Sequence, residues 1–180
     1  GLEGKAADVY FSAFNTLRLN PDPVFQFAGR SRRPPLDRIN AMLSFAYTLL
    51  LHEVIGAMES VGLDPAVGFL HCDRPGRPSL ALDMMEEFRS WVGDRFVLSL
   101  INNRRIGAGD FTVAANGAVL LTDSGRKTFL GAWQQRKQEI IEHPFAGEKM
   151  PLGHLFFAQA RILAKYLRDE IDCYVPFVRK

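Results

Sequence analysis

The stretch from Ile39 to Val61, INAMLSFAYTLLLHEVIGAMESV, decides the architecture of this chain. Its apolar residues recur every three or four positions, which is the spacing of one face of an α-helix. Pro34-Pro35 stands just before it, where a helix start tolerates proline. Gly62 and then Asp64-Pro65 follow it, and they favour a left-handed cap and a stop. The sequence therefore predicts one long central helix.

The segments on both sides of this helix are helical by the same criterion. We expect further helices at about 3–19, 79–100, 123–142 and 152–171, with Ser79 capping the second and a bend near Gly93. Asn116-Gly117 lies between two short apolar runs, 111–113 and 119–121, and favours a small β-hairpin. The predicted fold class is all-α: a multi-helix domain with one small β-hairpin, in which residues 1–180 form a single helical domain.

Composition excludes some classes of protein. With 180 residues and 47% hydrophobic content the chain can bury a core, and its net charge of +2 leaves no tail of one sign. Arginine outnumbers lysine 16 to 6, which suits phosphate binding or reflects codon usage in a GC-rich genome. Cys72 and Cys173 match neither a disulfide framework nor a metal-binding spacing, so we expect a reducing, cytoplasmic location. The longest apolar run, 41–51, is shorter than the ~18 residues of a membrane span, so we expect no membrane partner.

A histidine and nearby acids form the first candidate site. His71 precedes a basic loop, and Asp83, Glu86 and Glu87 lie on the next helix, where residues three or four apart share a face. Carboxylates among apolar residues need a partner, and a hard cation such as Mg²⁺ or Mn²⁺ would supply it. The alternatives stay open: His71 is a structural residue, the acids are solvated, and Glu3 only interacts favourably with the dipole of the first helix. Residue spacing alone gives a helical domain with an acidic site.

Four segments also resemble a known family. They are GLEG at 1–4, DRIN at 37–40, GLDPAVGFLH at 62–71 and SLALDMMEEFR at 79–89. They are similar to the C-terminal helical catalytic domain of the CRISPR-associated integrase and endonuclease, the catalytic subunit of the CRISPR adaptation (spacer-acquisition) complex. The similarity runs over most of the chain, as far as Tyr174–Phe177, and the family's N-terminal β domain is not part of this sequence.

The resemblance implies a site and a reaction. Glu3, His71 and Glu86 occupy the positions of the family's catalytic metal ligands, and Asp83 is a supporting residue behind the ligands or an alternative ligand. Glu87 points about 100 degrees away from Glu86 around the helix, so it is the weaker candidate. The implied cofactor is Mg²⁺ or Mn²⁺. The implied reaction joins the 3′-hydroxyl of a spacer DNA to the CRISPR repeat by transesterification, and hydrolytic nicking of branched or single-stranded DNA is the same chemistry with water.

The resemblance also implies partners. Arg74, Arg77 and Arg89 are the expected phosphate contacts, with surface solubility as the alternative. Expected partners are double-stranded and branched DNA, a second copy in the full-length family, a small ferredoxin-like adaptation subunit, and a fused or associated end-trimming nuclease.

Other interpretations compete with catalysis. A catalytically silent helical scaffold would bind DNA in a salt-dependent way without needing metal. A helix-turn-helix regulator is disfavoured by the apolar 43–51 region. His52-Glu53 lacks the second histidine of a zinc-protease signature, and Arg126-Lys127 with Arg136-Lys137 either extends a DNA-binding surface or is solvated.

Overall fold

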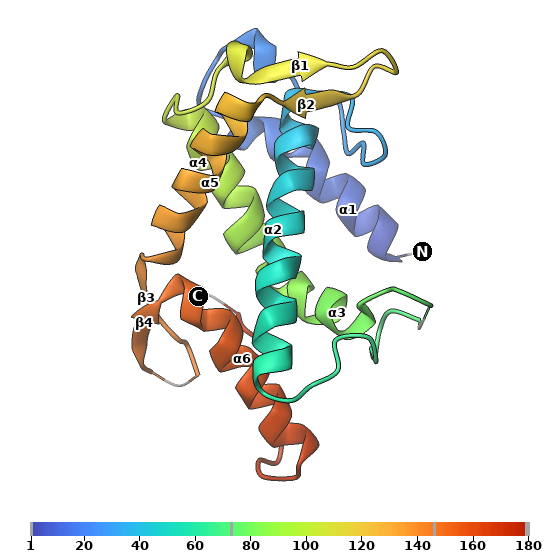
Figure 1. Ribbon diagram of the computed structural model, residues 1–180, viewed down its shortest axis with the longest axis vertical. Coiled ribbons are helices and arrows are strands. Elements are labelled where there is room, and N and C mark those ends of the chain that lie inside the picture. Colours follow the sequence, from blue (N-terminus) through green and yellow to red (C-terminus); the bar gives the residue numbers. More distant parts are fainter. Residues whose placement is uncertain (1, 73, 146, 179–180) are drawn as a thin grey trace. The chain divides into compact units, whose positions relative to one another are not determined.

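The computed structural model describes residues 2–72, 74–145 and 147–178, with the side chains of Leu2 and Glu3 left out (Figure 1). Helices dominate this part of the chain, which confirms the all-α prediction. The α-helices are α1 (Leu2–Ser12), α2 (Arg38–Ser60), α3 (Ser79–Phe88), α4 (Arg95–Asn102), α5 (Asp123–Lys137) and α6 (Leu152–Leu167). The strands are β1 (Phe111–Val113), β2 (Val119–Leu121), β3 (Ile140–Glu142) and β4 (Lys149–Pro151).

The chain divides into two compact units. One comprises Gly1–Ala46 and Gly93–Ala132, and the other comprises Tyr47–Val92 and Trp133–Lys180. Helix α2 contributes its first nine residues to one unit and the rest to the other, and a π-helical turn at Arg89–Asp94 joins α3 to α4 at the predicted bend.

The first unit is built around aromatic side chains. Phe14 is fully buried and its ring lies 5.2 Å from that of Phe27, while Phe96 and Phe129 meet edge to face at 5.0 Å. Strands β1 and β2 form the predicted antiparallel hairpin, with Phe111 opposite Leu121. The first unit therefore has its own apolar core.

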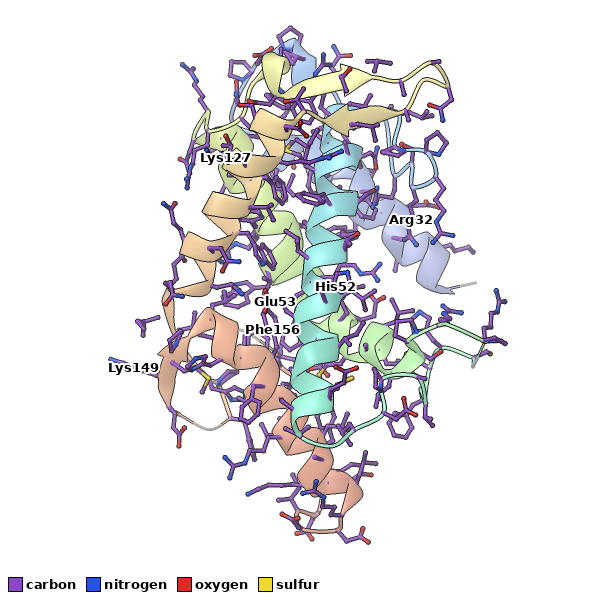
Figure 2. The ribbon with its side chains drawn as sticks, viewed as in Figure 1. Arg32, His52, Glu53, Lys127, Lys149 and Phe156 are labelled. Atoms are coloured by element: carbon purple, nitrogen blue, oxygen red, sulfur yellow. The ribbon has the colours of Figure 1, made fainter. Side chains whose placement is uncertain are left out.

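The second unit packs the end of α2 with α3 and α6. Leu50, Val54 and Met58 of α2 are fully buried. Phe88 of α3 meets Phe156 of α6 edge to face at 5.1 Å, and Figure 2 labels Phe156 on α6. Helix α2 is long and apolar enough to cross a membrane by composition alone, but these buried side chains make it a core helix of the fold.

Helix ends differ from the predictions in three places. The first helix ends at Ser12 and not near 19, because the hydroxyls of Ser12 and Thr16 donate to nearby carbonyls and the chain continues as a 3₁₀ turn. Residues 140–142 leave the expected helix and form β3, since β4 supplies an antiparallel partner. The last helix stops at Leu167. The described residues thus contain two strand pairs where the sequence predicted one hairpin.

The predicted end of α2 is confirmed. Gly62 has φ +79°, and the Leu63 N–H donates to the Met58 carbonyl at 3.0 Å, which is the pattern of a glycine-capped helix. This turn starts the loop that leads to His71.

Candidate metal centre

The loop from Gly62 to Pro78 is held against the start of α3 by backbone contacts. The Pro65 carbonyl accepts from the amides of Leu80 and Ala81 at 2.9 and 3.2 Å. The prediction that Ser79 caps this helix is wrong, because Ser79 is already its first helical residue and its Oγ donates instead to the Cys72 carbonyl. A backbone carbonyl, and not a side chain, satisfies the first amides of α3.

Gly68 lets the loop come this close. A Cβ atom at this position would lie 2.7 Å from the Ser79 Cβ and 3.0 Å from an Asp83 carboxylate oxygen. Both distances are shorter than ordinary van der Waals contact, so any side chain here would push the loop away from α3. The glycine is therefore required by the close approach of backbone and helix.

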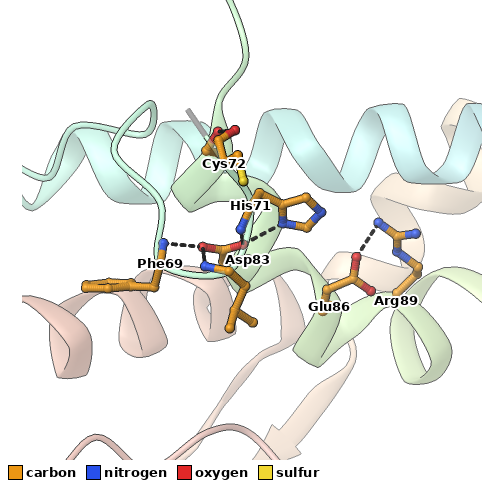
Figure 3. Close-up of polar contacts among 8 residues, drawn as sticks. Phe69, His71, Cys72, Asp83, Glu86 and Arg89 are labelled. Atoms are coloured by element: carbon orange, nitrogen blue, oxygen red, sulfur yellow. Dashed lines mark hydrogen bonds and ion pairs between the residues drawn. The ribbon is translucent and has the colours of Figure 1, made fainter. Parts of the chain in front are cut away.

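The Asp83 carboxylate gathers the loop around itself (Figure 3). It accepts three successive backbone amides, from Phe69 at 2.6 Å, Leu70 at 2.9 Å and His71 at 3.0 Å. It also meets the Nδ1 atom of the His71 ring at 2.5 Å. Burial opposes ionisation of this carboxyl, but these hydrogen bonds together hold the pKa of Asp83 below its usual value. Asp83 is therefore an ionised acceptor whose oxygens are already occupied.

This contact fixes the chemistry of His71. An ionised carboxylate can only accept, so Nδ1 carries the proton, and in the neutral ring Nε2 then presents its lone pair. Within the described part of the chain Nε2 has no hydrogen-bond partner. The His71 side chain is 24% exposed. A histidine oriented by a carboxylate in this way is the common arrangement of a metal-binding imidazole.

Glu86 lies on the same side of α3. It follows Asp83 by three residues, which places the two Cβ atoms about 5–6 Å apart on one face. Figure 3 shows the His71 ring pointing along α3 toward Glu86. The Glu86 side chain is 39% exposed and pairs with Arg89, whose Nη2 lies 2.7 Å from its Oε1. Arg89 in turn lies over the ring of Tyr47 at 4.9 Å.

Glu87 turns into the protein. Its two carboxylate oxygens accept from the Tyr174 hydroxyl at 2.5 Å and the Phe177 amide at 2.7 Å. Burial raises the pKa of Glu87, and these two hydrogen bonds offset part of that rise. The neighbouring acids therefore face different surroundings, and Glu87 anchors the C-terminal segment.

The remaining predicted site residues are placed as follows. Arg74 is exposed and Arg77 half-buried in the loop before α3, and their guanidinium groups make no ion pair with any residue that the structure describes. The backbone of Glu3 belongs to α1, and its side chain lies outside the described residues. Among residues 2–72, 74–145 and 147–178, no three histidine, cysteine or acidic side chains gather closely enough to hold an ion. The structure thus brings together His71 and Asp83, and Glu86 follows Asp83 by one helical turn on the same face of α3.

The donors that are present suit a hard divalent cation. His71 Nε2 and the Glu86 carboxylate would offer one nitrogen and one oxygen donor, a set compatible with Mg²⁺ or Mn²⁺. The spacing signal from the sequence found both residues, but it could not separate a ligand from a supporting acid. In the structure Asp83 accepts three loop amides and meets His71 Nδ1, whereas the contact of Glu86 among the described residues is with Arg89.

Two other sequence candidates are accounted for by ion pairs. Glu53 on α2, labelled in Figure 2, accepts from Lys137 at 2.6 Å, and Arg136 pairs with Glu139. His52 is exposed. Arg126 and Lys127 are also exposed, and Arg126 lies 3.7 Å from Asp123.

Comparison with known protein families identifies relatives over the whole length. Residues 1–135 match the family model of the CRISPR associated protein Cas1. The chain is 62% identical over 178 residues to "CRISPR-associated endonuclease Cas1 1" of Chlorobaculum tepidum, covering 99% of this chain and 52% of that protein. It is 47% identical over 180 residues to "CRISPR-associated endonuclease Cas1" of Leptospira interrogans, covering all of this chain and 70% of that protein. A "CRISPR-associated exonuclease Cas4/endonuclease Cas1 fusion" of Geobacter sulfurreducens is 44% identical, covering all of this chain and 33% of that protein.

Solved structures give the same result. The chain matches "Casposase bound to integration product" with a TM-score of 0.86 and 31% identity, over 96% of this chain and 48% of that one. It matches a "Cas6-RT-Cas1--Cas2 complex" chain with a TM-score of 0.83 and 26% identity, over all of this chain and 19% of that one. The chain spans about half the length of the first curated relative it matches.

Proposed function

Because the chain belongs to the CRISPR associated protein Cas1 family, we propose that residues 1–180 form the catalytic domain of a metal-dependent DNA integrase and endonuclease of CRISPR adaptation. The observation that carries the proposal is the pairing of His71 Nδ1 with Asp83, which leaves His71 Nε2 without a hydrogen-bond partner among the described residues. The relatives named as endonucleases and the casposase bound to an integration product support it.

The proposed reaction is a transesterification. The 3′-hydroxyl oxygen of a spacer DNA attacks the phosphorus of a repeat phosphodiester, a new P–O bond forms, and the P–O bond to the leaving 3′ oxygen breaks. The attacking hydroxyl loses its proton and the leaving oxygen gains one. With water as the nucleophile, the same exchange nicks branched or single-stranded DNA.

Three residues would hold Mg²⁺ or Mn²⁺. They are His71 through Nε2, Glu86 through its carboxylate, and Glu3 as the third ligand expected from the family resemblance. A divalent ion there would neutralise charge on the scissile phosphate and lower the pKa of the attacking hydroxyl. Asp83 keeps the proton of His71 on Nδ1 and holds the ring in place. Arg74 and Arg77 contact the DNA backbone by charge, without reading its sequence.

The proposed partners follow from the relatives. Double-stranded and branched DNA is the substrate, and in the full-length protein a second copy and a small ferredoxin-like subunit complete the assembly in the cytoplasm. The Cas1 and Cas2 components named in one structural neighbour support the subunit. The Cas4 fusion relative supports a fused or associated end-trimming nuclease.

The test is DNA joining by the full-length protein. A duplex with a free 3′-hydroxyl is incubated with supercoiled DNA that carries the repeat, in Mg²⁺, Mn²⁺ or EDTA. We expect a joined product that requires metal and is lost in His71→Ala and Glu86→Ala. The matched controls, His52→Ala and Glu59→Ala on exposed positions of α2, retain it. Salt-dependent DNA binding without joining or nicking in any metal would instead favour the silent scaffold.

A further inference from the structure

Glu86 has one charged neighbour among the described residues, Arg89, which contacts one of its two carboxylate oxygens. Arg89 Nη2 lies 2.7 Å from Oε1, and Oε2 has no partner among the residues that the structure describes. A carboxylate held by one oxygen presents the other in a defined direction. The contact with Arg89 therefore orients the second carboxylate oxygen of Glu86 in the absence of a cation.

The position of Arg89 is itself fixed by α2. Its guanidinium carbon lies 4.9 Å from the centroid of the Tyr47 ring, and the side chain is only 20% exposed. Its Nε is buried with no hydrogen-bond partner in the described part of the chain, so stacking and the Glu86 contact hold the group. Arginine suits this position because its planar group can stack and hydrogen-bond at once.

We propose that Arg89, stacked on Tyr47, is a positioning residue that orients Glu86 to bind the divalent cation through Oε2. The proposal rests on the metal site of the proposed function and extends it to Tyr47 on α2. It gives Glu86 the same kind of support that Asp83 gives His71: each ligand is oriented by one charged neighbour. Outer partners of this kind commonly change metal affinity by about 10-fold to 100-fold when removed.

The charge of Arg89 acts in the opposite direction, because a guanidinium repels a nearby cation. Removing Arg89 would therefore mix lost orientation with relieved repulsion. Tyr47→Leu keeps the charge of Arg89 and removes the ring on which it stacks, so it tests positioning without a change of charge, and Tyr47→Phe separates the ring from the other interactions of the Tyr47 hydroxyl. Tyr47→Phe keeps the ring, and Arg89→Lys keeps the charge but loses the planar fork.

The experiment is a Mn²⁺ titration of the full-length protein without DNA, with free Mn²⁺ followed by electron paramagnetic resonance. We expect Tyr47→Leu and Arg89→Lys each to raise the Mn²⁺ dissociation constant about 10-fold or more, while Tyr47→Phe and the control Tyr166→Leu stay near wild type. Tyr166 is 40% exposed on α6. Thermal unfolding in EDTA reports whether each variant is folded, and Arg89→Lys at a partly exposed side chain serves if Tyr47→Leu does not fold.

Two outcomes separate this inference from the proposed function. If Glu86→Gln abolishes Mn²⁺ binding but Tyr47→Leu and Arg89→Lys bind as tightly as wild type or more tightly, Arg89 does not position the ligand and the inference is overturned. If Glu86→Gln binds Mn²⁺ like wild type, the metal site of the proposed function is wrong, and the inference falls with it.

Discussion

Asp83 controls the geometry of the site although all of its hydrogen bonds go to the protein. Three amides and one imidazole converge on its carboxylate. Asp83→Asn keeps the shape but removes the charge and places an NH₂ group against these donors. We expect the free energy of unfolding to fall by about 1.5–3 kcal/mol and metal-dependent DNA joining to fall about 10-fold to 100-fold. Urea unfolding and the joining assay measure both effects, and Asp64→Asn in the preceding loop is the control.

The lowered pKa of Asp83 also predicts a pH dependence. Its stabilising contribution is fully present above the unfolded-state pKa of about 4 and is lost as the pH falls through the lower folded-state pKa. The stability difference between wild type and Asp83→Asn should therefore shrink as the pH falls below about 5. Urea unfolding across that range tests it, and a difference that stays constant would show that Asp83 is not an ionised acceptor.

Gly68 predicts a second single-residue effect. Gly68→Ala places a methyl group 2.7 Å from the Ser79 Cβ, so the loop must move away from α3. We expect a loss of about 1–3 kcal/mol of stability together with reduced joining, because the His71 amide and ring move with the loop. Gly131→Ala in α5, where nothing lies within 4 Å, should instead gain about 0.5–1 kcal/mol. Thermal unfolding measures the stability of both variants. An equal change in stability for Gly68→Ala and Gly131→Ala would show that Gly68 is not required by the close approach of the loop to α3.

Among the elements, helix α3 places two neighbouring acids, Glu86 and Glu87, in different surroundings. Glu86 is exposed and pairs with Arg89, and Glu87 binds the C-terminal segment through Tyr174 and Phe177. The Tyr174 hydroxyl also accepts from Gln159 at 2.7 Å. This segment therefore braces the side of α3 that is turned away from Glu86.

Removing the Tyr174 hydroxyl tests this brace. Tyr174→Phe leaves the Gln159 amide and one Glu87 oxygen without this partner, which should cost about 1–3 kcal/mol in the free energy of unfolding. The control is Tyr166→Phe on the exposed part of α6, which should change little. Both are measured by urea unfolding, and a loss no larger than that of the control would show that the network does not support α3.

Sequence periodicity predicted the elements well where one helical face is buried. The long helix needed only its apolar spacing, and its end at Gly62 followed from the chemistry of glycine. Residues 140–142 were missed because a strand depends on a partner further along the chain, β4, that local spacing does not reveal. The first helix was predicted too long because hydroxyl contacts at Ser12 and Thr16 compete with the apolar pattern.

At the scale of the whole molecule, we expect the arginines of the loop before α3 to determine how strongly salt weakens DNA binding. Arg74 and Arg77 are exposed or half-buried in the loop beside His71, so each is expected to contact one phosphate. Arg74→Gln and Arg77→Gln should each reduce the slope of log K against log salt by about 1. Arg168→Gln, remote in sequence and paired with Glu170, should leave the slope unchanged. DNA-binding isotherms at several salt concentrations measure this slope. An unchanged slope in the Arg74 and Arg77 variants would show that these arginines do not contact the DNA.

The candidate site was only partly predictable from the sequence. The spacing in the sequence predicted that His71, Asp83 and Glu86 belong to one site. The family resemblance implied that His71 and Glu86 bind the metal. The role of Asp83 as an acceptor of four contacts could not be predicted, because it depends on three loop amides that reach it where the backbone at Gly68 approaches α3 closely. The support of Arg89 by Tyr47 joins residues 42 positions apart, and no local pattern marks it.

The most direct test of the central claim is to crystallise the full-length protein with Mn²⁺ and to collect anomalous diffraction data at the manganese edge. We expect an anomalous peak within bonding distance of His71 Nε2 and of a Glu86 oxygen, with Asp83 still hydrogen-bonded to His71 Nδ1 and not bonded to the metal. A manganese ion bonded to Asp83, or the absence of an anomalous peak at His71 and Glu86, would contradict this metal site.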